Sequence, residues 1–186
     1  VYVATTTGVL KYYRDEDRFE MLEDLAGITI EYIAEDSRGS LWLASYSSGV
    51  YVYDSMKRCI QKRYSPQTGS ECIPDMISSV SIDDADNTWI VGFSSGFFRY
   101  DRIADRFREF STKTFPSLPT DVFFMALPDD FGNLWLSSDS GLIEFNAHKN
   151  TMRIFTAANG LLDENFTKAG IVLRDGRMAF GSANGF

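Results

Sequence analysis

The side chains that most often carry catalysis or bind metals are scarce in this chain of 186 residues. It contains one histidine, His148, and two cysteines, Cys59 and Cys72. A structural zinc site of ordinary spacing needs more Cys and His ligands than these, so structural zinc is excluded. His148 stands in the polar stretch NAHKN without a serine or cysteine motif to partner it, so a solvated loop histidine is favoured over a catalytic base. We therefore expect no catalytic residue, no metal and no cofactor.

The two cysteines leave one covalent possibility open. Cys59 and Cys72 are 13 residues apart (72 minus 59). A disulfide between them is sterically feasible if the compartment is oxidising. The sequence does not decide whether that disulfide forms.

Three aspartates, Asp36, Asp83 and Asp129, recur at similar places and could form a carboxylate cluster for acid–base work or for calcium. Asp36 and Asp129 begin Asp-x-x-Gly tetrads, in which aspartate caps a type I turn and glycine takes the left-handed position after it. In the middle copy Asp86 replaces that glycine, and Asp visits the left-handed region more readily than most residues. Because each aspartate occupies the same corner of a separate unit, we expect turn capping instead of a shared site.

The tryptophans reveal an internal repeat. Trp42, Trp89 and Trp135 are spaced by 47 residues (89 minus 42) and 46 residues (135 minus 89). In each copy an aspartate stands six positions before the tryptophan, and a glycine follows it by six or seven positions. These glycines are Gly49, Gly96 and Gly141. Degenerate copies at the two ends place Tyr2 and Met178 at the tryptophan position.

Each repeat predicts four short strands. Segments such as EYIAE, LWLAS and VYVYD are rich in aromatic and β-branched residues and are bounded by Gly, Ser and Asp. The second strand, LWL or TWI, is apolar at successive positions, so both of its faces must be covered. We therefore expect the sheets to stack on one another, with the tryptophans packed between them.

Four-stranded antiparallel units of about 45 residues that need a neighbour on either face are typical of the blades of a β-propeller, an all-β fold. The 186 residues hold about four blades, whereas most propellers of this repeat length close with six to eight. We expect an arc of a larger, seven-bladed-type ring; the alternative is a closed four-bladed ring in which the strands beginning at Val1 complete the unit of Met178. The expected boundaries are a partial blade at 1–27, blades at 28–76, 77–120 and 121–168, and a partial blade at 169–186.

Charge and hydropathy exclude further classes. With 26 acidic and 18 basic residues the formal net charge is −8, the wrong sign for binding a nucleic-acid backbone. No stretch approaches the roughly 18 consecutive apolar residues of a membrane-spanning helix, and the first residues lack a basic-then-apolar leader. We expect a soluble segment that meets a membrane only through other parts of a larger protein.

One propeller face could bind a ligand. The long Ser/Thr/Pro connectors SPQTGSECIPD and STKTFPSLPTD lead from one blade to the next, and such loops share a face with the turns between second and third strands. That face carries aromatic and polar groups of the kind that stack on sugar rings and bond hydroxyls. These candidate ligand-binding residues are Tyr46, Phe93, Lys113, Phe115, Asp139 and Asn165. Loop solvation and packing against a neighbouring blade are the alternative explanation for each of them.

The repeat resembles a known family. Its order of an apolar strand, Asp-x-x-Gly, a tryptophan strand, a small residue and Gly-φ-x-x-φ-Asp, where φ is apolar, resembles the two-component regulator propeller repeat over essentially the whole chain. The final section, FTAANGLLDENFTKAGIVLRDGRMAFGSANGF, is similar to the closing blade of the sensor region in hybrid two-component systems of glycan-foraging bacteria. WD-repeat and kelch propellers fit less well, because Gly-His, Trp-Asp and Gly-Gly pairs are absent from the sequence.

The resemblance implies a non-catalytic, periplasmic sensor region of an inner-membrane protein. A small molecule or oligosaccharide would shift the conformational equilibrium of a homodimer of the parent protein, whose histidine kinase and phosphorelay domains lie outside this segment. Two other functions stay open. A propeller enzyme of the lyase, lactonase or glycosidase type would need acidic or metal-binding residues converging on the central axis, and a protein-interaction scaffold would be compatible with the acidic surface.

Overall fold

The computed structural model describes residues 1–69 and 73–185, which form a series of antiparallel sheets. The first sheet contains β1 (Tyr2–Thr5), β2 (Gly8–Tyr13) and β3 (Arg18–Met21). The second contains β4 (Ile30–Glu35), β5 (Ser40–Ser45), β6 (Gly49–Asp54) and β7 (Cys59–Tyr64). The third contains β8 (Ile77–Ile82), β9 (Thr88–Gly92), β10 (Phe97–Asp101) and β11 (Arg106–Phe110). The fourth contains β12 (Phe123–Pro128), β13 (Asn133–Ser138), β14 (Gly141–Asn146) and β15 (Thr151–Phe155), and the fifth contains β16 (Phe166–Val172) and β17 (Met178–Ser182).

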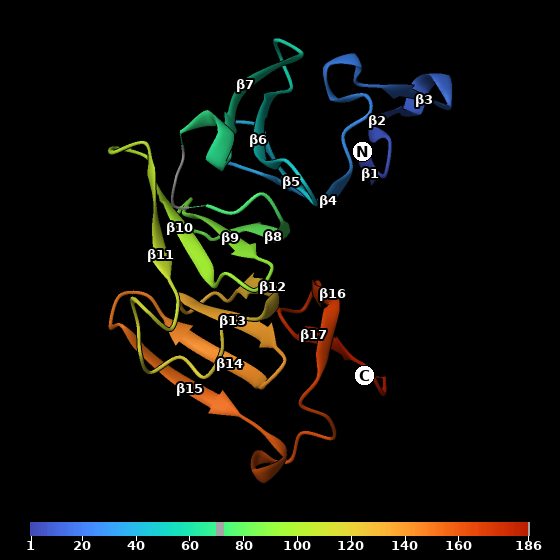
Figure 1. Ribbon diagram of the computed structural model, residues 1–186. Coiled ribbons are helices and arrows are strands. Elements are labelled where there is room, and N and C mark those ends of the chain that lie inside the picture. The colour runs from blue at the N-terminus through green and yellow to red at the C-terminus, as the bar shows by residue number, and fades with distance from the viewer. Residues whose placement is uncertain (70–72, 186) are drawn as a thin grey trace.

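Within each sheet, strands that follow one another in the chain are hydrogen-bonded neighbours, and the sheets succeed one another along an open arc (Figure 1). The connectors contain the short 3-10 helices η1 (Arg14–Glu16), η2 (Glu23–Leu25), η3 (Pro66–Thr68) and η4 (Ala157–Asn159). The first strands of the sheets line the inner side of the arc, where β1 contacts β4, β4 contacts β8, β8 contacts β12 and β12 contacts β16. This is the blade arrangement of a β-propeller, so the predicted fold class is confirmed.

The closed four-bladed ring does not form in the part of the chain that the structure describes. There, β17 pairs with β16 in a two-stranded sheet, and β1, β2 and β3 form a separate blade. The strands that begin at Val1 therefore do not complete the unit of Met178. The fifth sheet begins at Phe166, within the range 121–168 that the sequence assigns to the preceding blade.

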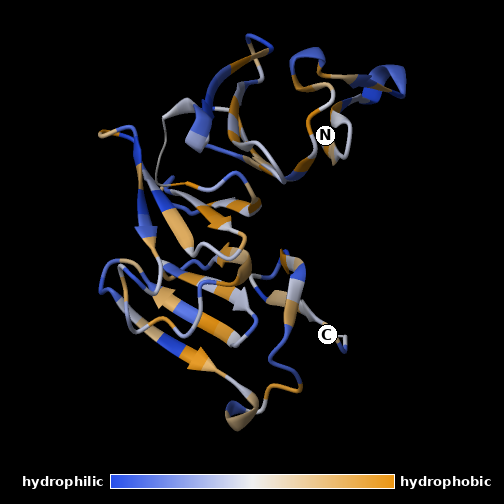
Figure 2. Ribbon diagram, in the orientation of Figure 1, coloured by the Kyte–Doolittle hydropathy of each residue, from blue (hydrophilic) through white to orange (hydrophobic). Residues whose placement is uncertain are grey.

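Apolar side chains of neighbouring sheets interlock. One buried cluster joins the first and second sheets, another the second and third, and another the third and fourth. Trp42 and Trp89 are each only 2% exposed within these clusters. Figure 2 shows hydrophobic segments on strands of the third and fourth sheets, including the edge strand β15. Burial between blades, which no single sheet achieves alone, therefore holds the arc together.

A hydrogen bond links the repeated aspartate to the repeated tryptophan of the same blade. The indole Nε1 donates to a carboxylate oxygen at 3.2 Å for Trp42 and Asp36, 2.9 Å for Trp89 and Asp83, and 3.0 Å for Trp135 and Asp129. The same carboxylates accept backbone N–H groups of their own corner, from Arg38 and Ser40, from Ala85 and Asn87, and from Phe131 and Asn133. The predicted turn capping is confirmed, and it also satisfies an indole N–H at a blade interface.

The third tryptophan has a different environment. The next sheet contributes Tyr100, 5.0 Å from Trp42 between ring centroids, and Phe145, 6.5 Å from Trp89. Trp135 instead stacks on Phe155 of its own sheet at 5.5 Å and lines a cavity of about 580 Å³ beside the fifth sheet. Its ring is therefore only partly buried.

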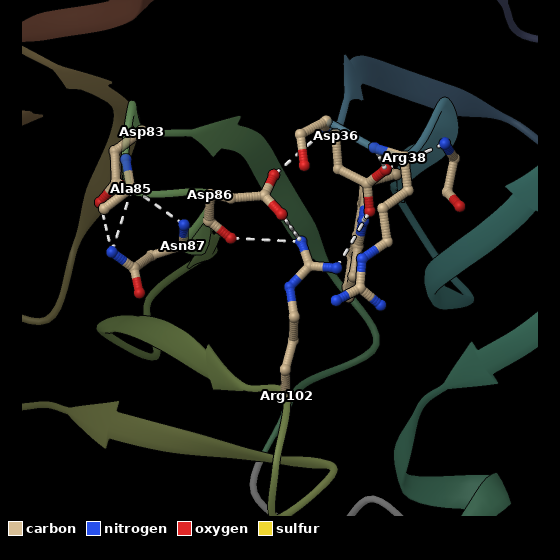
Figure 3. Close-up of polar contacts among 10 residues, drawn as sticks. Asp36, Arg38, Asp83, Ala85, Asp86, Asn87 and Arg102 are labelled. Carbon is tan, nitrogen blue, oxygen red and sulfur yellow. Dashed lines mark hydrogen bonds and ion pairs between the residues drawn. The ribbon is translucent and has the colours of Figure 1, made fainter.

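A polar contact also joins the corners of the second and third sheets (Figure 3). Arg102, in the turn after β10, lies 2.9 Å from Asp86 Oδ2 and 3.4 Å from Asp36 Oδ2 through its two terminal nitrogens. The backbone N–H of Ser37 donates to Asp86 Oδ1 at 3.0 Å. Asp86 has a φ of 61°, the left-handed conformation that glycine has in the other corners. The replacement of glycine by aspartate at this corner therefore supplies a carboxylate that bridges two blades.

Asp105, in the same turn, connects these two sheets a second time. Its carboxylate accepts hydrogen bonds from Tyr64 Oη at 2.6 Å and Tyr100 Oη at 2.5 Å, and it pairs with Lys62. Lys62 and the two hydroxyl groups lower the pKa of Asp105 to about 2. Burial and the hydrogen bond to Asp105 raise the pKa of Tyr64.

Asp83→Ala should destabilise the protein more than the loss of an ordinary surface side chain. The change removes the acceptor of the Trp89 indole and of two backbone N–H groups, and leaving such donors unpaired costs about 1–3 kcal/mol. Urea unfolding followed by circular dichroism measures the difference. Asp84→Ala, at the exposed neighbouring position, is the matched control. Equal unfolding free energies for the two variants would contradict the role of Asp83.

Asp105→Asn should make the free energy of unfolding fall less steeply as the pH is lowered. The folded-state pKa of Asp105, about 2, lies below the roughly 3.9 of an unfolded aspartate, so its contribution is present above pH ~4 and is lost as the pH falls towards 2. Because the side chain is 49% exposed, the expected effect is about 1 kcal/mol or less. Urea midpoints between pH 5 and 2.5 test this, with Asp84→Asn as the control. An equally steep loss in Asp105→Asn and in the unmodified protein would disprove it.

Candidate ligand-binding face

In the second, third and fourth blades, the turn between the second and third strands is tied to the residue just before the inner strand, and in the fifth sheet the residue after β17 makes the same contact. The backbone N–H groups donate from Tyr46 to Thr29 O at 3.4 Å, from Phe93 to Met76 O at 3.0 Å, from Asp139 to Val122 O at 3.4 Å and from Ala183 to Asn165 O at 3.0 Å. The repeated contact places these turns and the interblade connectors on one face, as the sequence predicts. Tyr46, Phe93 and Asp139 are therefore equivalent positions along the arc.

The repeated glycine holds these turns against the rest of the structure. Gly96 donates its N–H to Asp121 O in the connector to the next blade at 2.9 Å, and Gly49 and Gly141 make the matching contacts. A Cβ atom on Gly96 would lie 2.3 Å from Phe110 O, and φ is 81°. Only glycine fits where the turn approaches the fourth strand so closely at a positive φ.

The inner strands change register near this face. The pairing shifts between Ile30 and Tyr32, between Ile77 and Ser79, between Phe123 and Met125, and between Phe166 and Gly170. An extra residue in one strand of a pair redirects the side chains around it. The extra residues include Glu31 in β4 and Lys168 in β16.

Those two residues meet. Lys168 Nζ lies 3.0 Å from Glu31 Oε2, which links the inner strand of the fifth blade to that of the second. The same ammonium group lies 5.2 Å from the centroid of the Tyr46 ring. The three side chains form a cluster, which we call the mouth cluster, and each keeps between 30% and 45% of its surface exposed. Such a cluster offers a ring face, a cation and a carboxylate to a ligand.

The six residues predicted from the sequence divide into two groups. Tyr46 and Phe93 are 45% and 40% exposed at equivalent turns, and Asp139 and Asn165 are exposed beside inner strands of the same face. Phe115, in contrast, packs its ring edge against Phe145 at 5.9 Å. Lys113 lines a separate cavity of about 350 Å³ with residues that include Ser94, Glu109 and Asp121.

Sequence reasoning missed Glu31 and Lys168. A signal existed for both, because each is a charged residue next to the apolar residues that begin an inner strand, in IEYIAE and FTKAG. A charge in a strand with a buried face indicates either a bulge or an exposed inner edge. The pairing of residues 137 positions apart, however, depends on the curvature of the arc, which the sequence does not give.

The repeated aspartates do not gather into one site. Asp36, Asp83 and Asp129 cap separate corners, and in residues 1–69 and 73–185 no three His, Cys, Asp or Glu side chains gather as metal ligands would. His148 is exposed in the turn after β14. Cys72 lies outside the described residues, so the disulfide with Cys59 that the sequence leaves undecided is not settled by the structure. The described part of the chain contains no helix with the length and hydropathy of a membrane span.

Comparison with known proteins finds similar structures but no match by sequence. No family profile matches the sequence, and no curated protein matches it. The fold is similar to the extracellular domain of BT3049 from B. thetaiotaomicron, described as a hybrid two-component system, with 15% identity and a TM-score of 0.79 over 98% of this chain and 26% of that one. The extracellular domain of BT4673 from the same organism gives 18% identity and a TM-score of 0.71 over 84% and 23%. YCF48 bound to D1 peptide gives 9% identity and a TM-score of 0.63 over 89% and 55%.

The chain therefore spans about a quarter of the length of the first two structures. Both are extracellular domains of proteins described as hybrid two-component systems, which is the family that the repeat resembles. At these identities the likeness shows the fold, and function has to be argued from the site.

Proposed function

We propose that this chain is a ligand-recognition segment of an extracytoplasmic sensor, located in the periplasm as part of a hybrid two-component system. The repeat pattern and the two similar extracellular domains support this class. The segment recognises a small polar molecule, with an oligosaccharide as the favoured ligand, and performs no chemistry on it. Binding shifts the conformational equilibrium of a homodimer of the parent protein, and the kinase and phosphorelay domains of that protein pass on the signal.

The mouth cluster is the observation that carries the proposal. Tyr46 presents an exposed ring on the face where connectors and turns meet, and Lys168 and Glu31 present charged hydrogen-bonding groups beside it. Pyranose rings stack their C–H faces on aromatic rings, while their hydroxyl groups bond cations and carboxylates. Phe93 repeats the aromatic position one blade further along, so a ligand of several sugar units would find a second ring.

The cluster also suits a sensor because it joins distant blades. A ligand that separates Lys168 from Glu31, or bridges them, changes a contact between the second and the fifth blade. Differential contacts of this kind are what allow a ligand to shift a conformational equilibrium.

Neutral trisaccharides such as maltotriose, xylotriose and mannotriose should be screened by thermal unfolding. A ligand present at 100 times its Kd stabilises the folded protein by about 2.7 kcal/mol, which raises Tm measurably. We expect at least one such sugar to raise Tm, and Tyr46→Ala and Lys168→Met to abolish the rise. Phe131→Ala is the matched control, because Phe131 is an aromatic residue 87% exposed at a corner on the other face.

Two outcomes would contradict the proposal. Consumption of a sugar, detected by chromatography of the mixture, would favour an enzyme. A rise in Tm that survives both mouth variants but is lost in Phe131→Ala would move the site away from the mouth.

A protein-interaction scaffold is the second candidate, and one comparison favours it. The similar structure YCF48 is bound to D1 peptide, so a fold of this kind accommodates a peptide partner. Exposed apolar residues such as Ile103 and Leu162 would serve that role. Failure of every sugar to change Tm, together with capture of one defined peptide that Ile103→Ser or Leu162→Ser weakens, would favour this function.

A further inference from the structure

An apolar groove lies between the fourth and fifth sheets. It consists of two cavities of about 580 and 330 Å³, both of which are lined by Leu142 and Phe180. Trp135 and Met178 line the larger cavity, and Leu162, which is 97% exposed, lines the smaller one. We call the two cavities together the blade groove. Large apolar side chains gathered at a concave surface mark an interaction site.

The first two tryptophans of the repeat show what covers this position at the preceding junctions. Each indole lies beside one aromatic ring from the fourth strand of its own sheet and beside another from the third strand of the next sheet. The ring centroids lie 6.2 Å (Tyr64) and 5.0 Å (Tyr100) from Trp42, and 6.1 Å (Phe110) and 6.5 Å (Phe145) from Trp89. An indole between two blades is therefore covered by a ring from each of them.

Trp135 has only the first kind of neighbour in residues 1–69 and 73–185. Phe155, from the fourth strand of its own sheet, stacks on it at 5.5 Å. The fifth sheet consists there of β16 and β17, so it has no third strand to supply the second ring. The cavity beside Trp135 therefore corresponds to the place that Tyr100 and Phe145 fill at the two preceding junctions.

The edge of β17 offers the backbone groups that a further strand would need. In the second, third and fourth sheets the second strand is paired on both sides, whereas β17 is paired with β16 alone among the described strands. An unpaired strand edge presents a row of N–H and C=O groups that can bind another strand. The turn after β17 also matches the turn that leads into β14, because Ser182 Oγ donates to Gly185 O and Ser138 Oγ donates to Gly141 O, both at 2.7 Å. The fifth sheet thus has the turn from which a third strand begins in the fourth sheet.

We propose that the blade groove binds a β-hairpin, which adds to the edge of β17 as a third and a fourth strand and places an aromatic ring on Trp135. The occupant is a hairpin of the same repeat, because the interface that recurs at the preceding junctions continues here. Its aromatic residue stands four positions after the glycine of its repeat, as Tyr100 does after Gly96 (100 minus 96) and Phe145 after Gly141 (145 minus 141).

The pairing in the fourth sheet also gives the register of the hairpin. Phe145 pairs with Leu134, the residue before Trp135. The corresponding residue of the fifth sheet is Arg177, which precedes Met178, so the aromatic residue of the hairpin lies opposite Arg177. The proposal does not rest on the sensor function, because it follows from the packing between blades alone.

A synthetic peptide with the sequence of residues 143–155, which covers most of β14 and all of β15, is the probe. Titrated into the unmodified protein labelled with ¹⁵N, it should shift the indole signal of Trp135 and leave that of Trp89 in place. It should also slow hydrogen exchange of β17 amide groups, because the free edge becomes paired. Replacing Phe145 by alanine in the peptide should weaken binding about tenfold, because the ring on Trp135 is lost.

A peptide of the same composition in scrambled order is the matched control, and it should not bind at about 1 mM. All changes are made in the peptide, so no outcome depends on whether a protein variant folds. Failure of the 143–155 peptide to bind, equal binding of the scrambled or the Phe145→Ala peptide, or a shift at Trp89 instead of Trp135 would each overturn the proposal. A Trp135 signal that moves with protein concentration in the absence of peptide would show a second copy of the chain in the groove, which would also overturn it.

Discussion

A buried indole whose N–H group must be satisfied is the constraint on which the rest of this structure depends. Trp42 and Trp89, each in the second strand of its sheet, lie between that sheet and the next, and the aspartate six positions earlier accepts the indole N–H group. That aspartate also caps the corner that turns the first strand into the second. One carboxylate thus fixes the local turn and permits burial of the largest side chain, and repetition of the pair along the chain generates blades that need each other.

Much of the fold could be predicted from the sequence, because the interactions that define it are local and repeated. Asp36 and Trp42, for example, stand six residues apart and touch within one hairpin. The recurring glycine could also be found in the sequence. Its physical reason, which is the close approach of Gly96 to the fourth strand, is seen only in the structure. The site was less predictable. Tyr46 was found through its turn, whereas Lys168 and Glu31 come together through the curvature of the arc, and Phe115 proved to pack against Phe145.

The two faces of the arc have different chemical character, and the departures from the repeat account for it. On the mouth side, irregular inner strands direct Glu31 and Lys168 towards each other. On the corner side, Asp86 in place of a turn glycine pairs with Arg102 and ties two blades together. The regular turns present Tyr46 and Phe93, and the irregular inner strands bring Glu31 and Lys168 together.

Hydrogen–deuterium exchange at the indole N–H groups, followed by ¹⁵N NMR, tests the interlocking of the blades most directly. Trp42 and Trp89, each 2% exposed and hydrogen-bonded, should exchange only through large opening of the structure, and the partly exposed Trp135 should exchange faster. Exchange of Trp42 and Trp89 at the rate of a free indole would show that these rings are not held between the sheets.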